Sequence, residues 1–128
     1  METASPREDV ALVCTDLMFT SKVTGTGKEL GRKVRVFPSA KAATAAVHPD
    51  LRVALLDLSN PKNTPPEDVS AWKAALPPQA VLIAYGSHVD VPALQAAREA
   101  GCDAVLPRSA FVQRLTQILA GDSSDENA

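Results

Sequence analysis

The segment Val53-Ala-Leu-Leu-Asp-Leu-Ser-Asn-Pro61 is the most informative part of this 128-residue chain. Its first half is a continuous apolar run rather than an alternating one, which is typical of a strand covered on both faces, as in a parallel sheet. Asp57 lies near the end of that run, just before polar residues and a proline. We therefore expect a buried strand over Val53–Leu58 with a carboxylate at its carboxyl end.

The rest of the chain repeats this pattern of a short apolar run followed by a helical segment. In the first gap, for example, Phe19, Val23 and Leu30 lie on one face of a helix that ends at Gly31. Strands alternating with helices predict an α/β domain with a single doubly wound, five-stranded parallel sheet and helices on both faces. The other four expected strands are Val10–Thr15, Val34–Phe37, Ala80–Tyr85 and Ala104–Leu106.

Composition limits the classes of function. Hydrophobic residues make up 45% of the chain and charged residues 22%, which predicts one globular domain over residues 9–120, with a flexible leader at 1–8 and a disordered acidic tail at 121–128. The formal net charge of −2 argues against nucleic acid as a partner. No signal peptide or membrane-length apolar run is evident, so we expect a cytoplasmic protein without membrane contact.

In open α/β sheets the functional groups gather beyond the carboxyl ends of the strands. Asp16 follows the first expected strand and Asp57 ends the third. If these strands are neighbours, two carboxylates share one crevice and need a cation between them, either Mg²⁺ or the side chain of Arg108. The other expected crevice residues are Thr15, Tyr85, Gly86, Ser87 and His88.

A second motif, Gly25-Thr-Gly-Lys28, has some likeness to a phosphate-binding loop. It lacks the first glycine and the hydroxyl residue of that motif, and it falls inside a helical pattern rather than directly after a strand. We interpret it as a helix face of small residues.

The five βα units, the acid after the first strand and Asp57 followed by Pro61 resemble a response-regulator receiver domain of the CheY-like superfamily. The segment Gly101–Phe111 is similar to that family's Gly-x-x-x-x-(Val/Leu)-x-Lys-Pro-Phe segment. The resemblance implies a flavodoxin-like sheet with strand order 2-1-3-4-5. It also implies that Asp57 is the phosphate acceptor and that Asp16 and Asp57 bind Mg²⁺.

The chain departs from the family at three positions beside Asp57. Where the family has two adjacent acids, this chain has Thr15-Asp16, so Mg²⁺ should bind more weakly. Tyr85 stands where the family has the Ser or Thr that binds the phosphoryl oxygen. The family's lysine after the fifth strand corresponds to Pro107 or Arg108, depending on the register. The resemblance is therefore to an atypical receiver.

These features predict a stand-alone, non-enzymatic module of two-component or phosphorelay signalling. It would act through protein contacts with a kinase or a downstream effector, as a monomer or weak homodimer. Phosphorylation of Asp57 is the alternative mode of action. A small α/β ligand-binding domain or enzyme is the competing interpretation, with a crevice formed by Asp16, Asp57, Ser87, His88 and Arg108.

Overall fold

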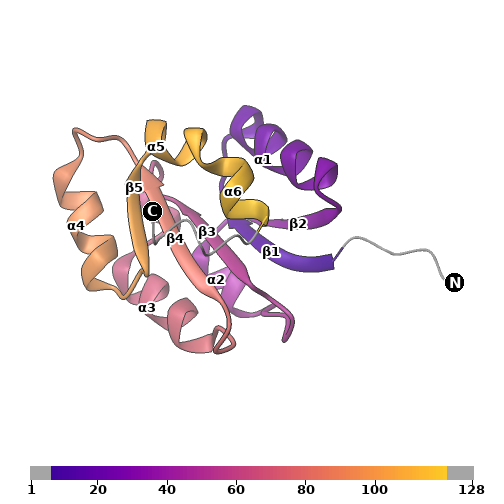
Figure 1. Ribbon diagram of the computed structural model, residues 1–128. Coiled ribbons are helices and arrows are strands. Elements are labelled where there is room, and N and C mark those ends of the chain that lie inside the picture. Colours follow the sequence, from indigo (N-terminus) through magenta and orange to yellow (C-terminus); the bar gives the residue numbers. More distant parts are fainter. Residues whose placement is uncertain (1–6, 121–128) are drawn as a thin grey trace, which may run out of the picture.

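The computed structural model describes residues 7–120 and contains one five-stranded parallel sheet (Figure 1). The strand order is β2-β1-β3-β4-β5, as the family resemblance implies. Because all neighbouring strands are parallel, their carboxyl ends lie along one edge of the sheet. The strands are β1 (Arg7–Val13), β2 (Arg32–Phe37), β3 (Val53–Asp57), β4 (Val81–Gly86) and β5 (Ala104–Pro107).

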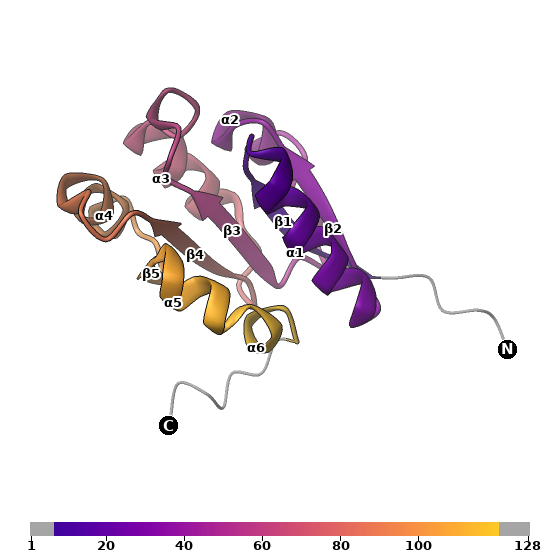
Figure 2. The ribbon, with the colours of Figure 1, turned by 90° about the horizontal axis from the view of Figure 1, so that it is seen from above.

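Helices cover both faces of the sheet, which confirms the predicted doubly wound architecture (Figure 2). One layer contains α1 (Leu17–Glu29), α5 (Arg108–Gln113) and α6 (Leu115–Ala120). The other contains α2 (Ala40–Thr44), α3 (Pro66–Ala75) and α4 (Val91–Glu99), and a short 3₁₀ turn, η1 (Pro61–Asn63), follows β3.

The hydrophobic core consists of one cluster on each face of the sheet. Every residue of β3 is buried, as expected for a strand with neighbours on both sides and helices on both faces. Trp72 of α3 is fully buried in the cluster beneath α2, α3 and α4. Tyr85 and Phe111 are fully buried in the other cluster, beneath α1, α5 and α6. Trp72 therefore lies on the face of α3 that packs against the sheet.

Two features differ from the sequence predictions, the start of β1 and the continuity of the last helix. β1 begins at Arg7, inside the expected leader, because Arg7 pairs with Arg32 of β2. The leader residues 1–6 and the acidic tail 121–128 lie outside the described residues. The last helix is divided, because Arg114 has φ −104° and ψ 8°, the geometry of a turn.

Within residues 7–120, each helix falls short of the length and apolar character that crossing a bilayer requires.

Candidate functional site

Asp57 is the last residue of β3 and lies at the carboxyl edge of the sheet. β1 and β4 are the neighbours of β3, so groups at the ends of those two strands surround this carboxylate. Only 5% of Asp57 is exposed to solvent. A carboxylate this deeply buried needs hydrogen-bond donors or a cation as compensation for its lost hydration.

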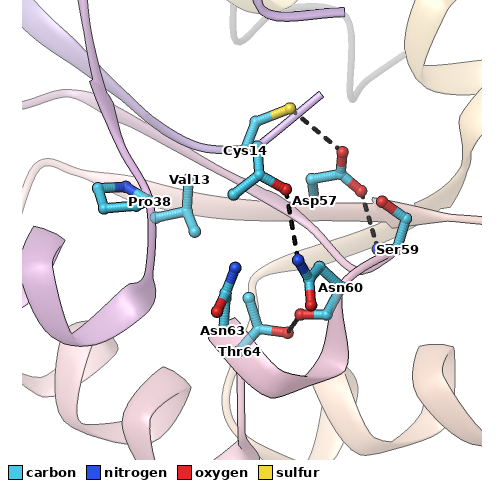
Figure 3. Close-up of a pocket in the computed structure, with 9 residues that line it drawn as sticks. Val13, Cys14, Pro38, Asp57, Ser59, Asn60, Asn63 and Thr64 are labelled. Carbon is cyan, nitrogen blue, oxygen red and sulfur yellow. Dashed lines mark hydrogen bonds between the residues drawn. The ribbon is translucent and has the colours of Figure 1, made fainter. Parts of the chain in front are cut away.

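Protein groups provide that compensation at both carboxylate oxygens. The Cys14 thiol donates to Oδ2 with a sulfur–oxygen distance of 3.3 Å, and the backbone N–H of Ser59 donates to Oδ1 at 2.8 Å (Figure 3). Arg108 Nη2 lies 3.5 Å from Oδ1 and supplies the positive charge. Asp57 is therefore a hydrogen-bond acceptor enclosed by a thiol, an amide and a guanidinium.

Arg108 reaches Asp57 from two strands away. It follows β5, which pairs with β4, and β4 in turn pairs with β3. Its guanidinium therefore extends past the end of β4. This position answers the question of register that the sequence left open, because Arg108 rather than Pro107 faces the carboxylate.

Asp16 follows β1, next to β3, but its carboxylate has a local role. Asp16 Oδ1 accepts from the backbone N–H groups of Met18 and Phe19, at 3.0 and 3.1 Å, and so caps α1. The side chain of Asp16 is exposed, in contrast to that of Asp57. Thr15, also exposed, accepts a 3.4 Å hydrogen bond from Asn60 Nδ2.

Cys14 is the site residue that sequence reasoning missed as a partner of Asp57. Cys14 is a buried free thiol, with 5% of the residue exposed. Burial raises the pKa of the Cys14 thiol, so it remains a protonated donor toward Asp57. The available signal was its position: Cys14 is the first residue after β1, beside the strand that carries Asp57.

Tyr85 lies inside the core. Its ring stacks on Phe111 at a centroid distance of 4.2 Å and lies 5.0 Å from the ring of Phe19. The Tyr85 hydroxyl is buried and lacks a hydrogen-bond partner among the described residues. Burial raises the pKa of Tyr85 far above its ordinary value, and the nearby Asp57 charge raises it further. Burial therefore favours the neutral form of the Tyr85 phenol in the folded protein.

The loop after β4 carries the remaining predicted crevice residues. Ser87 and His88 are both exposed. Ser87 Oγ accepts from the backbone N–H of Val89 at 3.4 Å, which makes it a turn residue of this loop. Gly86 is buried, and a Cβ at this position would lie 3.2 Å from Leu58 Cβ, so the close approach of the two strand ends requires a small residue.

A shallow pocket opens on one side of Asp57 (Figure 3). Its lining does not include Tyr85, Ser87, His88 or Arg108, the residues that the ligand-binding interpretation would need. The lining residues are Val13, Cys14, Thr15, Pro38, Asp57, Ser59, Asn60, Asn63 and Thr64.

The groups around Asp57 are poor ligands for a hard divalent cation. Mg²⁺ prefers carboxylate and carbonyl oxygens, whereas Asp57 faces a protonated thiol and a guanidinium. Within residues 7–120 the structure has no group of three or more His, Cys, Asp or Glu side chains placed to hold a metal ion. The residues present therefore fit a magnesium site poorly.

Comparison by sequence finds neither a matching protein-family model nor a matching curated protein. Comparison of structures finds similar folds. A response regulator protein from Burkholderia pseudomallei, crystallised with a phosphorylated aspartic acid, calcium ion and citrate, has a TM-score of 0.66 and 15% identity over 94% of this chain and 73% of that one.

Two further structures are similar to a comparable degree. One is the Saccharomyces cerevisiae co-crystal of a histidine phosphotransfer signaling protein with the receiver domain of its downstream response regulator (TM-score 0.66, 12% identity, 91% of each chain). The other is the Mn²⁺-bound form of the response regulator Rcp1 (TM-score 0.63, 19% identity, 90% of this chain and 91% of that one). At these identities the likeness establishes that the chain has the fold of a receiver domain.

Proposed function

We propose that this protein is a receiver-like module of two-component or phosphorelay signalling that acts through protein–protein contacts. In this proposal Asp57 is a fixed part of the crevice rather than a group that must be modified. The module has no catalytic activity of its own. Support comes from the receiver fold combined with the position of Asp57 at the carboxyl end of the third strand.

One observation carries the contact-only form of this proposal. Both oxygens of Asp57 already accept hydrogen bonds from the protein, and Arg108 faces the carboxylate as a cation. Transfer of a phosphoryl group to Asp57 would have to displace the thiol or the guanidinium. It would also proceed without the carboxylates that hold a metal beside such a site.

The two predicted metal ligands, Asp16 and Asp57, support only weak Mg²⁺ binding in this proposal. The capping bonds of Asp16 to the start of α1 compete with metal coordination. Similar folds have been crystallised with calcium or manganese, so divalent cations are compatible with the fold in general. Mg²⁺ remains a prediction for this chain, with low affinity.

The partner we propose is a kinase or a downstream effector, contacted beside the crevice near β4, α4 and β5. The exposed loop Ser87–Asp90 and the half-exposed Arg108 belong to that surface. A similar fold has been crystallised with a histidine phosphotransfer protein, which shows that this architecture accommodates a protein partner. We propose that the module itself is a monomer or a weak homodimer.

Intact-mass spectrometry after incubation with acetyl phosphate and Mg²⁺ tests the proposal. We expect no adduct of about 80 Da, the mass of one added phosphoryl group, because the acceptor oxygens of Asp57 are already bonded. An adduct that disappears in Asp57→Asn would contradict the contact-only form and establish phosphorylation.

A thermal-shift screen with nucleotides, flavins and phosphorylated metabolites is the second test, and it addresses the competing ligand-binding interpretation. A saturable stabilisation that is lost in Arg108→Ala but kept in the matched Arg114→Ala variant would favour a ligand-binding domain instead. The contact-only proposal predicts a flat response to all three ligand classes, because the pocket beside Asp57 is shallow and excludes Arg108.

A further inference from the structure

The C-terminal helical segment of the domain is divided at Arg114 into two helices, α5 and α6 (Figure 1). Arg114 is exposed, and its backbone N–H is shared between Ala110 O at 3.1 Å and Phe111 O at 3.2 Å. The sequence from 108 to 120 contains no proline or glycine, which are the usual local causes of a break in a helix. The break therefore follows from how α6 packs on the rest of the domain.

Two leucines hold α6 on the domain. Leu115 and Leu119 are buried in the core cluster that also contains Val10 of β1 and Val23 of α1. The opposite side of α6 faces solvent, where Thr116 is exposed. α6 has only six residues, and a helix this short is not stable in water without packing. Its helical form therefore depends on the position of these two leucines in the core.

One arginine fastens the far end of α6 to the sheet. Arg32 is the first residue of β2, and its Nη2 donates to the backbone carbonyl of Ala120, the last residue of α6, at 3.0 Å. Nη1 of the same guanidinium pairs with the carboxylate of Asp9 in β1. The planar fork of an arginine can serve two acceptors in a fixed geometry. We call these two contacts the Arg32 clasp, because together they tie the first two strands to the last helix.

The closed clasp leaves Asp9 incompletely satisfied. Asp9 is fully buried, and its Oδ1 lacks a hydrogen-bond partner among the described residues. The pairing of β1 with β2 shifts between Arg7 and Val10, and an irregularity of this kind re-aims a side chain of the strand. A buried carboxylate oxygen without a donor destabilises the state that contains it. Water that enters when α6 moves away would hydrate this oxygen, so the closed state is poised to open.

We infer that α6 is a hinged strap, which the Arg32 clasp holds closed and which opens about Arg114 while the sheet stays folded. The closed strap covers the end of the core cluster, and the open strap exposes Leu115 and Leu119. Arg108 precedes the hinge, at the start of α5, so its ion pair with Asp57 is kept when the strap opens. This conformational device is independent of the proposed signalling function.

Amide hydrogen exchange of the ¹⁵N-labelled full chain, followed by NMR, tests this inference. The N–H of Ile118 donates to Arg114 O at 2.9 Å and reports on the strap. The N–H of Leu58 donates to Tyr85 O at 2.9 Å and reports on the sheet beside Asp57. Because a local opening releases only the strap, we expect Ile118 to exchange faster than Leu58 and the amides of β3.

Arg32→Lys and Arg35→Lys are the matched variants, because both make the same substitution in β2. A lysine at residue 32 can still pair with Asp9, but one ammonium on a flexible chain does not reproduce the two arms of the fork. Arg35 lies on the opposite face of the strand, 5.4 Å from the centroid of the Phe37 ring. We expect Arg32→Lys alone to speed exchange at Ile118 by about tenfold, with the amides of β3 unchanged.

Three results would overturn the inference. If Ile118 exchanges as slowly as the amides of β3 in the unaltered protein, α6 opens only when the whole domain unfolds. If the two variants have equal effects at Ile118, the second arm of the Arg32 fork does not hold the strap. If Arg32→Lys speeds exchange throughout the chain, Arg32 determines global stability and is not a clasp.

Discussion

Asp57 and Arg108 form an ion pair, but removing one or the other should have unequal effects on the free energy of unfolding, because they differ in burial. Asp57 is 5% exposed, whereas the side chain of Arg108 is 41% exposed. In Arg108→Ala a buried carboxylate would lose its cation, so we expect the free energy of unfolding to fall by about 1–3 kcal/mol. In Asp57→Asn the guanidinium turns toward water, and the loss should be smaller. Urea denaturation of both variants measures the difference.

The double variant Asp57→Asn/Arg108→Ala serves as the control for this pair. It should be more stable than Arg108→Ala, because the unpaired buried charge is gone. A double variant that is less stable than Arg108→Ala would show that the unpaired carboxylate of Asp57 is not the cause of the loss in Arg108→Ala.

Tyr85 gives stability a dependence on alkaline pH. Burial raises the pKa of Tyr85 in the folded protein, so above pH ~10 only the unfolded chain loses the phenolic proton. The stabilisation is complete below that pH and is lost as the pH rises, at up to about 1.4 kcal/mol per pH unit. Tyr85 is the only tyrosine in the sequence, so urea denaturation can be paired with ultraviolet absorbance of one phenol.

The variant Tyr85→Phe isolates this effect. Its stability should decline less steeply above pH ~10 than that of the unaltered protein. At neutral pH it should match or exceed the original, because the buried hydroxyl lacks a partner. Absorbance at pH ~10.5 from a phenolate in the folded protein would contradict the buried position.

At the residue scale the sequence was informative about position and poor at predicting partners. Asp57 was predicted to lie at the carboxyl end of a buried strand, and Arg108 was named as a candidate cation; the structure brings the two together. It could not be foreseen that Asp16 would bond to α1 and that Cys14 would face Asp57. Adjacent residues after a strand point in different directions, and the exact strand end decides which one faces inward.

At the scale of elements, α1 contains a natural pair of glycines for comparison. Gly25→Ala should stabilise the protein by about 0.5–1 kcal/mol, because the site is open and alanine favours a helix. Gly27→Ala should destabilise it, because its Cβ would come within 2.7 Å of Val34. Thermal denaturation of the two variants tests the opposite signs, and a loss of stability in both would show that α1 does not tolerate any Cβ in this region.

The carboxylate of Asp103, the residue directly before β5, links α3 to the amino end of β4. Asp103 accepts from Lys73 Nζ of α3 at 2.9 and 2.7 Å and from the backbone N–H of Leu82 in β4 at 2.8 Å. Partial burial opposes ionisation, but these bonds and the Lys73 charge together hold the pKa of Asp103 below its ordinary value of 3.8. Its ionised form is therefore favoured by folding.

The contribution of Asp103 should be complete above pH ~4 and should be lost as the pH falls below that value. Because the side chain is 40% exposed, we expect only about 0.5–1 kcal/mol. Urea denaturation between pH ~2.5 and ~6 should show a smaller acid loss in Asp103→Asn than in the unaltered protein. Identical pH profiles would mean that solvent screens the interaction completely.

The regular elements were predictable because their patterns are local. Ser39 and Asp90 cap α2 and α4 as polar residues before apolar stripes, and Gly31 and Gly101 end α1 and α4 with φ of 73° and 108°. The break at Arg114 was not predictable, because Phe111, Leu115 and Leu119 keep helical spacing across it.

At the scale of the whole molecule, strand order followed from the resemblance rather than from strand patterns. Five apolar runs with intervening helices are compatible with more than one parallel order. The Asp57–Pro61 segment and the Gly101–Phe111 segment selected the receiver order, which the structure has. Function could not be obtained in this way, because a fold carries many functions and the site decides among them.

The effect of Mg²⁺ on thermal stability tests whether a divalent cation binds beside Asp57. With a protonated thiol and a guanidinium beside Asp57, about 10 mM Mg²⁺ should raise the Tm by less than about 1 °C. Differential scanning fluorimetry of the unaltered protein and of Asp57→Asn measures this. A rise of several degrees that is absent in Asp57→Asn would show that a cation displaces Arg108.

The guanidinium of Arg108 is part of the polypeptide, so the charge beside Asp57 is present from the moment of folding. In the proposed contact-only function, the ion supply and the phosphodonor level around the protein would not change the group that faces Asp57. The output of the protein would then follow mass action, with partner occupancy set by how much of the protein is synthesised and degraded. The concentration of the protein, rather than its covalent modification, would then determine how much partner is bound.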